Sequence, residues 1–197
     1  MFQIRQAMNT DSQPMLDIYA PVIEKTATSF EFTVPTVEEF QYRVSKILEQ
    51  LPWLVCTNGP SVAGYAYAGS HRSREAYQWS AELSVYIDPL YHRRGIARAL
   101  YTALAGILKL QGFYTALAGI TLPNDTSVGF HEAFGFKPVG IYHNVGHKFG
   151  RWHSVGWWEY QLQPYKSDPV PPVTIKDIAG TLECNRLIRS ATEMIKH

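Results

Sequence analysis

A chain of 197 residues has the length of a single domain with a short appendage. Hydrophobic residues form 46% of it and charged residues 18%, which excludes a globally disordered chain and permits a packed core. The formal net charge of +1 excludes charge-driven binding to nucleic acid or an anionic membrane, because such binding needs a clustered basic excess. No apolar run reaches the ~18 residues of a membrane span and no signal peptide is visible, so a cytoplasmic protein is expected.

Hydrophobic periodicity and turn signals divide the chain into alternating strands and helices. Thr36 and Glu39 have the form of a capping box, Asn58-Gly59 predicts a hairpin turn, and Gly112 predicts a helix end. The expected elements are a strand over 2–6, a helix ending near 22, a helix from 36 to about 50, strands over 53–57, 62–68 and 77–87, a helix over 95–111, a strand over 113–120, a short helix over 126–134, and strands over 136–142 and 155–162. This order predicts a mixed α/β sheet.

The C-terminal part of the chain has a different composition. Four prolines between Pro164 and Val173 predict a stiff linker, and a weakly amphipathic helix is expected over 174–196, although Gly180 is unfavourable inside a helix. The expected organisation is a domain over residues 1–163, a linker over 164–173 and a helical tail over 174–197. The tail is expected to pack on the domain or on a neighbouring chain.

The segment YHRRGIARAL, residues 91–100, combines two arginines, a glycine and the start of a helix. The first N–H groups of a helix have no intrahelical acceptor, and the helix dipole adds partial positive charge there. Gly95 lets an anion approach the backbone, while Arg93 and Arg94 add charge at the rim, so the segment predicts a phosphate cradle. The absence of GxxxxGK[ST] and GxGxxG disfavours a nucleoside-triphosphate loop and a dinucleotide fold. A capped helix with a basic first turn is the alternative, and the loop alone does not separate the two.

Two motifs in order carry a resemblance to a known family. The stretch HRRGIA at 92–97 is similar to the Gln/Arg-x-x-Gly-x-Gly/Ala loop of the GCN5-related N-acetyltransferases (GNAT), with His92 where Gln or Arg is usual. NDTS at 124–127 followed by HEAFGF at 131–136 is similar to the family's next landmark, with His131 in the position of a tyrosine. Over residues 3–162 the chain resembles the phosphinothricin and methionine sulfoximine acetyltransferase branch. The segments that carry this likeness are GYAYA at 64–68, RSREAYQW at 72–79, ELSVY at 82–86, LAGI at 117–120 and FGRWHSVGWW at 149–158.

The resemblance implies the α/β GNAT fold, a mixed and mostly antiparallel sheet that is flanked by helices and splayed at the acetyl-CoA site. It implies that the open backbone of a strand and the phosphate loop hold acetyl-CoA, and that Asn124 bonds the pantetheine arm or holds its own turn. The residues expected to contact acetyl-CoA are Leu83, Ser84, Val85, Tyr86, Ile87, His92, Arg93, Arg94, Gly95, Ile96, Ala97, Arg98 and Asn124.

Two side chains are candidates for catalysis. In the strand that ends at Ile87, odd positions are apolar and even positions polar, so Glu82 points away from the core beside the phosphate loop. With the resemblance, we interpret Glu82 as the base that takes a proton from the substrate amine; the alternative is a solvated glutamate. The oxyanion is expected near Leu83–Val85. His131 is expected to give the leaving thiolate a proton or a hydrogen bond, and its alternative role is to cap the short helix.

Arg72, Arg74 and Tyr77 resemble the branch's grip on the anionic end of an amino-acid-like substrate, because the arginine fork bonds two oxygens. They could equally be surface residues on a loop. Phe30 is a candidate wall of the same pocket or a core residue. No metal site is expected, because glycines interrupt the spacing of His143, His147 and His153.

The resemblance therefore implies a homodimeric N-acetyltransferase that moves acetyl from acetyl-CoA to the α-amine of phosphinothricin, methionine sulfoximine or methionine sulfone, by direct attack in a ternary complex. Acetylation of phosphinothricin would imply resistance to that compound as a herbicide. The alternatives are acetylation of a protein N-terminus, a polyamine or a drug, and a non-catalytic acyl-CoA sensor. Two arginines in the pocket would disfavour a cationic substrate.

Overall fold

The computed structural model describes residues 1–196 and is organised around one twisted sheet. Its seven strands have the order β1-β2-β3-β4-β5-β7-β6, and every neighbouring pair is antiparallel except β4 and β5. The strands are β1 (Phe2–Gln6), β2 (Trp53–Asn58), β3 (Ser61–Ser70), β4 (Ser80–Ile87), β5 (Thr115–Leu122), β6 (Lys137–Lys148) and β7 (Arg151–Gln161). The prediction of a mixed, mostly antiparallel α/β sheet is confirmed.

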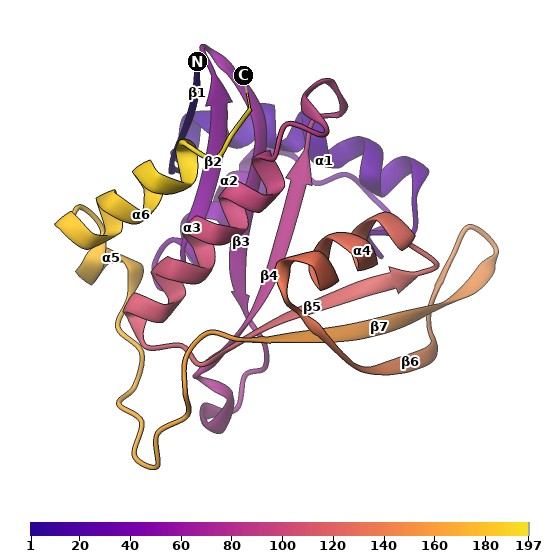
Figure 1. Ribbon diagram of the computed structural model, residues 1–197. Coiled ribbons are helices and arrows are strands. Elements are labelled where there is room, and N and C mark those ends of the chain that lie inside the picture. Colours follow the sequence, from indigo (N-terminus) through magenta and orange to yellow (C-terminus); the bar gives the residue numbers. More distant parts are fainter. Residues whose placement is uncertain (197) are drawn as a thin grey trace.

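Helices cover both faces of this sheet and divide its core in two (Figure 1). The helices are α1 (Ser12–Lys25), α2 (Val37–Ile47), α3 (Ile96–Gln111), α4 (Asp125–Phe134), α5 (Ile175–Ile178) and α6 (Leu182–Thr192). The apolar face of α3 packs on one side of the sheet, and α1 and α2 pack on the other around Trp53 and Tyr65. No helix within the described part combines the length and apolar character needed to span a membrane.

The strand β4 obeys the predicted alternation. Ala81 and Leu83 are buried in the core beneath α3. Tyr86 lies on the opposite face, where its ring contacts Tyr19 of α1 at 4.9 Å and Tyr65 of β3 at 5.3 Å between centroids. Because side chains alternate along a strand, Glu82 shares the face of Tyr86 and points away from α3.

Most expected elements are confirmed, with changes at several of their ends. The strand expected from residue 77 begins at Ser80, because Glu75–Tyr77 form a 3-10 turn. The next strand is β5 over Thr115–Leu122, two residues later than expected, and α1 continues to Lys25. The last two strands are much longer than expected: β6 runs to Lys148 and β7 begins at Arg151. Phe149 and Gly150 join them in a tight turn with φ of +51° and +73°.

The C-terminal tail packs on the main core as two helices. The single helix expected over 174–196 is wrong, because Gly180 has φ of +84° and separates α5 from α6. Ile175, Cys184, Ala191 and Ile195 are buried in the same cluster as α3. The described part of the tail is therefore an additional layer of the core; residue 197 lies outside the described residues.

Candidate active site

The sheet opens between β4 and β5. These strands pair only over Ser80–Glu82 and Thr115–Leu117, and beyond that point they diverge (Figure 1). A cavity of about 320 Å³ fills the gap. Its lining includes Leu83, Ser84, Val85 and Tyr86 from β4, Ala118 and Gly119 from β5, Ala97 and Tyr101 from α3, and Asn124, Ser127, Phe130 and His131 from α4 and its cap. We call this space the splay cavity.

The predicted phosphate loop lies at the far end of β4. Gly95 is the N-cap of α3 and has φ of +83°, and Arg93 has φ of +63°, which is uncommon for a residue with a side chain. A Cβ atom at Gly95 would be strained at this φ, so a bare backbone is required where α3 begins. The tail supports the loop from outside, because the Lys196 N–H donates to the Arg94 carbonyl at 2.9 Å. The loop therefore presents the first amides of α3 on a rigid base.

The other residues expected at the cofactor lie at the end of β4, at the start of α3 and at the cap of α4. His92 Nε2 lies 3.1 Å from the Ile87 carbonyl, so its side chain folds back onto the end of β4. The Ile96 side chain is buried, which leaves its backbone for binding, and Arg98 Nη1 donates to the Ala133 carbonyl at 3.4 Å. Asn124 caps α4 by accepting from the Ser127 N–H at 3.1 Å. A further cavity of about 750 Å³ borders Ile87 and His92 and shares Val85 and Tyr86 with the splay cavity, so a continuous groove follows β4.

Glu82 is the last residue of β4 that pairs with β5 before the strands diverge. Its Oε1 atom is 2.7 Å from Nδ1 of His71, which follows β3 directly. The Glu82 side chain is 36% exposed, so its carboxylate is accessible. Its sequence neighbour Leu83 lines the splay cavity, and its hydrogen-bond partner His71 lines a separate cavity of about 700 Å³. Glu82 itself lines neither cavity, and its carboxylate is linked to the larger one through His71.

The larger of these two spaces brings together the residues predicted to bind an anion. His71, Arg72, Arg74 and Tyr77 all line it, and the Arg72 guanidinium lies 5.6 Å above the Tyr77 ring. The segment predicted to be a linker contributes to the wall through Pro172 and Val173. We call this space the arginine cavity. Phe30 does not line it, because its ring contacts Gly146 and His153 in the β6–β7 hairpin.

His131 is buried at the wall of the splay cavity. Its Nδ1 atom lies 2.7 Å from the Ser127 carbonyl, and its Nε2 atom lies 3.1 Å from the Tyr101 hydroxyl. Burial lowers the pKa of His131, and the Ser127 carbonyl only partly opposes this effect. The imidazole is therefore neutral at pH 7, donating through Nδ1 and accepting from Tyr101.

Trp157 of β7 connects the two cavities. Its ring contacts His71 of the arginine cavity at 5.7 Å and Tyr142 at 5.9 Å. The same ring would be met by a Cβ at Gly119, which lines the splay cavity. Its indole N–H is buried without a hydrogen-bond partner among the described residues. An unsatisfied buried donor of this kind costs free energy.

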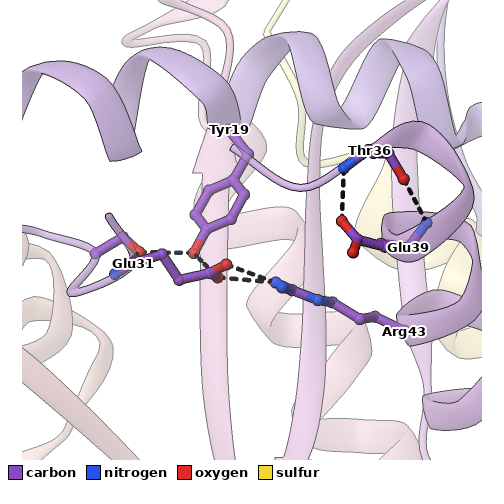
Figure 2. A network of polar contacts seen from close by, with 6 residues as sticks. Tyr19, Glu31, Thr36, Glu39 and Arg43 are labelled. Atoms are coloured by element: carbon purple, nitrogen blue, oxygen red, sulfur yellow. Dashed lines mark hydrogen bonds and ion pairs between the residues drawn. The ribbon is translucent and has the colours of Figure 1, made fainter. Parts of the chain in front are cut away.

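A polar network fixes the segment between α1 and α2 that lies over this face of the sheet (Figure 2). Glu31 Oε1 accepts from the Tyr19 hydroxyl at 2.8 Å, and both Glu31 oxygens accept from Arg43 Nη1 at 2.8 and 2.9 Å. The capping box of Thr36 and Glu39 is present at the start of α2, as predicted. Thr26 and Thr28 of the same segment line the splay cavity, so the network holds one of its walls.

Comparison with known proteins agrees with this geometry. Residues 4–157 match the family described as Acetyltransferase (GNAT) domain. The chain therefore belongs to the GNAT acetyltransferases, and the resemblance read from its motifs is confirmed.

Particular relatives are named for small amino-acid-like substrates. The chain is 38% identical over 173 residues to phosphinothricin N-acetyltransferase of Streptomyces viridochromogenes, covering 87% of this chain and 94% of that protein. It is 30% identical to the L-methionine sulfoximine/L-methionine sulfone acetyltransferase of Salmonella typhimurium, covering 82% and 95%. The crystal structure of a phosphinothricin acetyltransferase from Sinorhizobium meliloti in complex with acetyl-CoA superposes with a TM-score of 0.82 at 30% identity, covering 87% and 95%.

Sequence reasoning missed three residues of the site. His71 lies between two predicted strands, Tyr142 is the last residue of the strand predicted over 136–142, and Tyr101 lies in the apolar helix predicted over 95–111. Each is identified only by a hydrogen bond to a residue distant in sequence. His71 bonds Glu82, Tyr142 bonds Arg72 at 3.4 Å, and Tyr101 bonds His131.

Proposed function

We propose that this enzyme transfers an acetyl group from acetyl-CoA to the α-amine of a small amino-acid-like substrate of the phosphinothricin or methionine sulfoximine type. The observation that carries the proposal is an accessible carboxylate at the point where β4 and β5 separate: Glu82 is hydrogen-bonded to His71 of the arginine cavity and precedes Leu83, which lines the splay cavity. A base at that point suits direct attack of one bound substrate on the other.

The residues along the groove fit acetyl-CoA. Beyond Glu82 the inner edge of β4 is open, so its backbone can pair with the amide groups of a pantetheine arm. The helix start at Gly95, with Arg93 and Arg94 beside it, suits a diphosphate because its amides and dipole favour negative charge. Acetyl-CoA supplies the activated acyl group, and its acyl oxygen is expected near the open N–H groups of Leu83–Val85.

In this proposal Glu82 removes the proton that makes the amine unreactive. An amine arrives as ammonium, and it becomes a nucleophile only after a proton passes to the carboxylate, directly or through water. The amine nitrogen then forms a bond to the acyl carbon, and the carbon–sulfur bond breaks.

We assign to His131 the positioning of the Tyr101 hydroxyl at the wall of the splay cavity, since its Nδ1 proton is engaged by the Ser127 carbonyl and its Nε2 atom bonds that hydroxyl. The hydroxyl can turn to give the leaving thiolate a hydrogen bond. The proton that leaves the nitrogen when the amide forms passes through water to the thiolate, which departs as a thiol. Asn124 would act mainly by holding the turn before α4, since its side chain already caps that helix.

The arginine cavity supports an anionic acceptor. Arg72 and Arg74 line it together, and each guanidinium can bond a carboxylate or phosphinate through two oxygens. A polyamine or another cationic acceptor is disfavoured by the same two charges. The experiment compares this proposal with two alternatives. One is acetylation of a protein N-terminus or a drug, and the other is a protein that only senses acyl-CoA.

The test replaces Glu82 with glutamine and measures steady-state acetylation of phosphinothricin and methionine sulfoximine, together with acetyl-CoA binding by calorimetry. General-base removal is expected to lower kcat by about 10²–10⁴-fold, with the Kd for acetyl-CoA unchanged. Glu159→Gln, an exposed glutamate on β7, is the matched control and should keep wild-type rates. An unchanged kcat in Glu82→Gln would overturn the assignment, and binding without any turnover in the unmodified protein would favour the sensor.

We also propose that two copies associate in the cytoplasm through the β6–β7 hairpin. Val139, Ile141, Val145 and Trp152 are exposed on it, which is an apolar surface at the edge of the sheet. Light scattering of the purified protein would give twice the chain mass; a monomeric mass would contradict this proposal.

A further inference from the structure

His71 is a histidine that the proposed chemistry leaves without a role. It follows the last residue of β3, where Gly69 pairs with Glu82 of β4, so the chain leaves the sheet directly beside the carboxylate. Its side chain is 15% exposed. Among residues 1–196, His71 makes the one hydrogen bond that the Glu82 carboxylate receives, at 2.7 Å between Nδ1 and Oε1.

The two neighbours of the imidazole define where its proton lies. A carboxylate only accepts hydrogen bonds, so Nδ1 must carry the proton in the contact with Glu82. On the other side of the ring, Arg72 Nε lies 3.3 Å from Nε2, and a guanidinium only donates. The Nε2 atom is therefore an acceptor. This assignment follows from the partners, since hydrogen atoms themselves are not observed.

The ring is also held mechanically. Trp157 and Tyr77 contact it edge-to-face, each at 5.7 Å between centroids and with interplanar angles of 75° and 77°. These contacts come from opposite parts of the site, one from β7 and one from the turn before β4. A side chain held by two rings and two hydrogen bonds has little rotational freedom, so its Nδ1–H has a fixed direction.

We propose that His71 is a positioning residue for Glu82. Its Nδ1–H holds one carboxylate oxygen, Oε1, so that the other oxygen is directed to the amine of the acceptor. Arg72 ties the same imidazole to the arginine cavity, and therefore the base is oriented by a chain of contacts that begins at the group expected to bind the anion. This role rests on the proposed function, because it requires Glu82 to be the base.

The test uses two amide variants that differ in where they place a donor. In His71→Asn the side-chain amide nitrogen takes the place of Nδ1 and can still donate to Glu82. In His71→Gln the amide lies at the level of Nε2 and cannot replace that bond without moving the chain. A third variant, His71→Leu, removes both polar atoms.

We expect His71→Leu and His71→Gln to lower kcat by about 10–100-fold, which is the scale of losing one hydrogen bond to a charged group. The Kd for acetyl-CoA should change little, because His71 does not line the splay cavity. The Km for the amine should rise by less than kcat falls, because Arg72 loses only its contact with the imidazole. His71→Asn should restore kcat to within about threefold of the wild-type value. Equal losses in the Asn and Gln variants would overturn the proposal, as would a loss confined to Km.

A double-mutant comparison separates this inference from the proposed function. If His71 acts through Glu82, then His71→Leu should cause no further loss of kcat in a Glu82→Gln background. Additive losses would refute the positioning role while leaving Glu82 as the base. If Glu82→Gln alone leaves kcat unchanged, the proposed function fails first. Because His71→Leu could unfold the site, thermal unfolding of every variant is measured, and the Asn-to-Gln comparison decides the matter without it.

Discussion

Replacing Lys148 with methionine is expected to detach the β6–β7 hairpin from the end of α1. The Lys148 side chain is buried, and its Nζ donates to the carbonyls of Ile23, Thr26 and Ser29 at 2.6, 2.9 and 2.7 Å. Ile23 lies in the last turn of α1, where carbonyls lack an intrahelical partner and the helix dipole is negative. One ammonium group therefore bonds both the end of α1 and the segment after it, which lines the splay cavity.

The magnitude follows from the groups left without a partner. The bonds to Ile23 and Ser29 are buried, and an unsatisfied buried carbonyl costs about 1–3 kcal/mol. Methionine also removes the cost of burying an ammonium, which offsets part of that loss. We expect a net destabilisation of about 3 kcal/mol, which a domain with a typical stability of about 5–15 kcal/mol survives. For a chain of this size the Tm should fall by about 10 °C.

The assay is urea unfolding followed by circular dichroism, with thermal unfolding as a second readout. Lys137→Met is the matched control, because Lys137 is an exposed lysine at the other end of the same strand. It should change stability by less than about 0.5 kcal/mol. If Lys148→Met is no less stable than this control, the three carbonyl contacts do not hold the hairpin and the reasoning is refuted.

Two further substitutions test the N-terminal edge and the tail. Burial raises the pKa of Asp11, but hydrogen bonds from Arg5 and the Met8 N–H outweigh it, so the folded-state pKa lies below its ordinary value. This carboxylate stabilises the fold above its unfolded pKa of about 3.9, and the stabilisation is lost as pH falls through the folded pKa. At pH 7, Asp11→Asn should therefore be less stable than the wild type, and in acid the two proteins should become equally stable. Urea unfolding midpoints measured across this pH range check the prediction. Ile195→Ala should raise the Kd for acetyl-CoA in calorimetry, because Ile195 anchors the tail where it supports the phosphate loop; an unchanged Kd in a folded variant would show that the loop is independent of the tail.

Strong local signals explain what the sequence predicted correctly. The alternation of polar and apolar residues in β4 placed Glu82 on the open face. If the two faces of the strand were exchanged, three polar side chains would be buried in the core. Gly95 was predicted to leave the backbone bare where α3 begins, and it is the N-cap of that helix; its left-handed φ was not predicted. These features depend on a few adjacent residues.

Features set by distant partners were not predicted. The stretch of residues 143–148 carries histidines and a glycine and does not read as a strand, yet β6 continues through it. Its extension is stabilised by Lys148 bonding α1 and by the Phe30 ring packed on Gly146. His71 belongs to the same class, because its role depends on the register that brings Gly69 opposite Glu82.

The openness of the site follows from how the strands are paired. The outer edge of β5 is bonded to β7 along its whole length, from Thr115 to Leu122, and the outer edge of β4 is bonded to β3 from Ala81 to Ile87. Each strand has a second, inner edge, and these two edges pair only as far as Glu82 and Leu117, where the strands diverge. The inner edges therefore stay unpaired beyond Glu82, and their amide and carbonyl groups need partners from elsewhere. A ligand with its own amide groups satisfies that need, so the same pairing that stabilises the sheet also preserves a binding site beside the base.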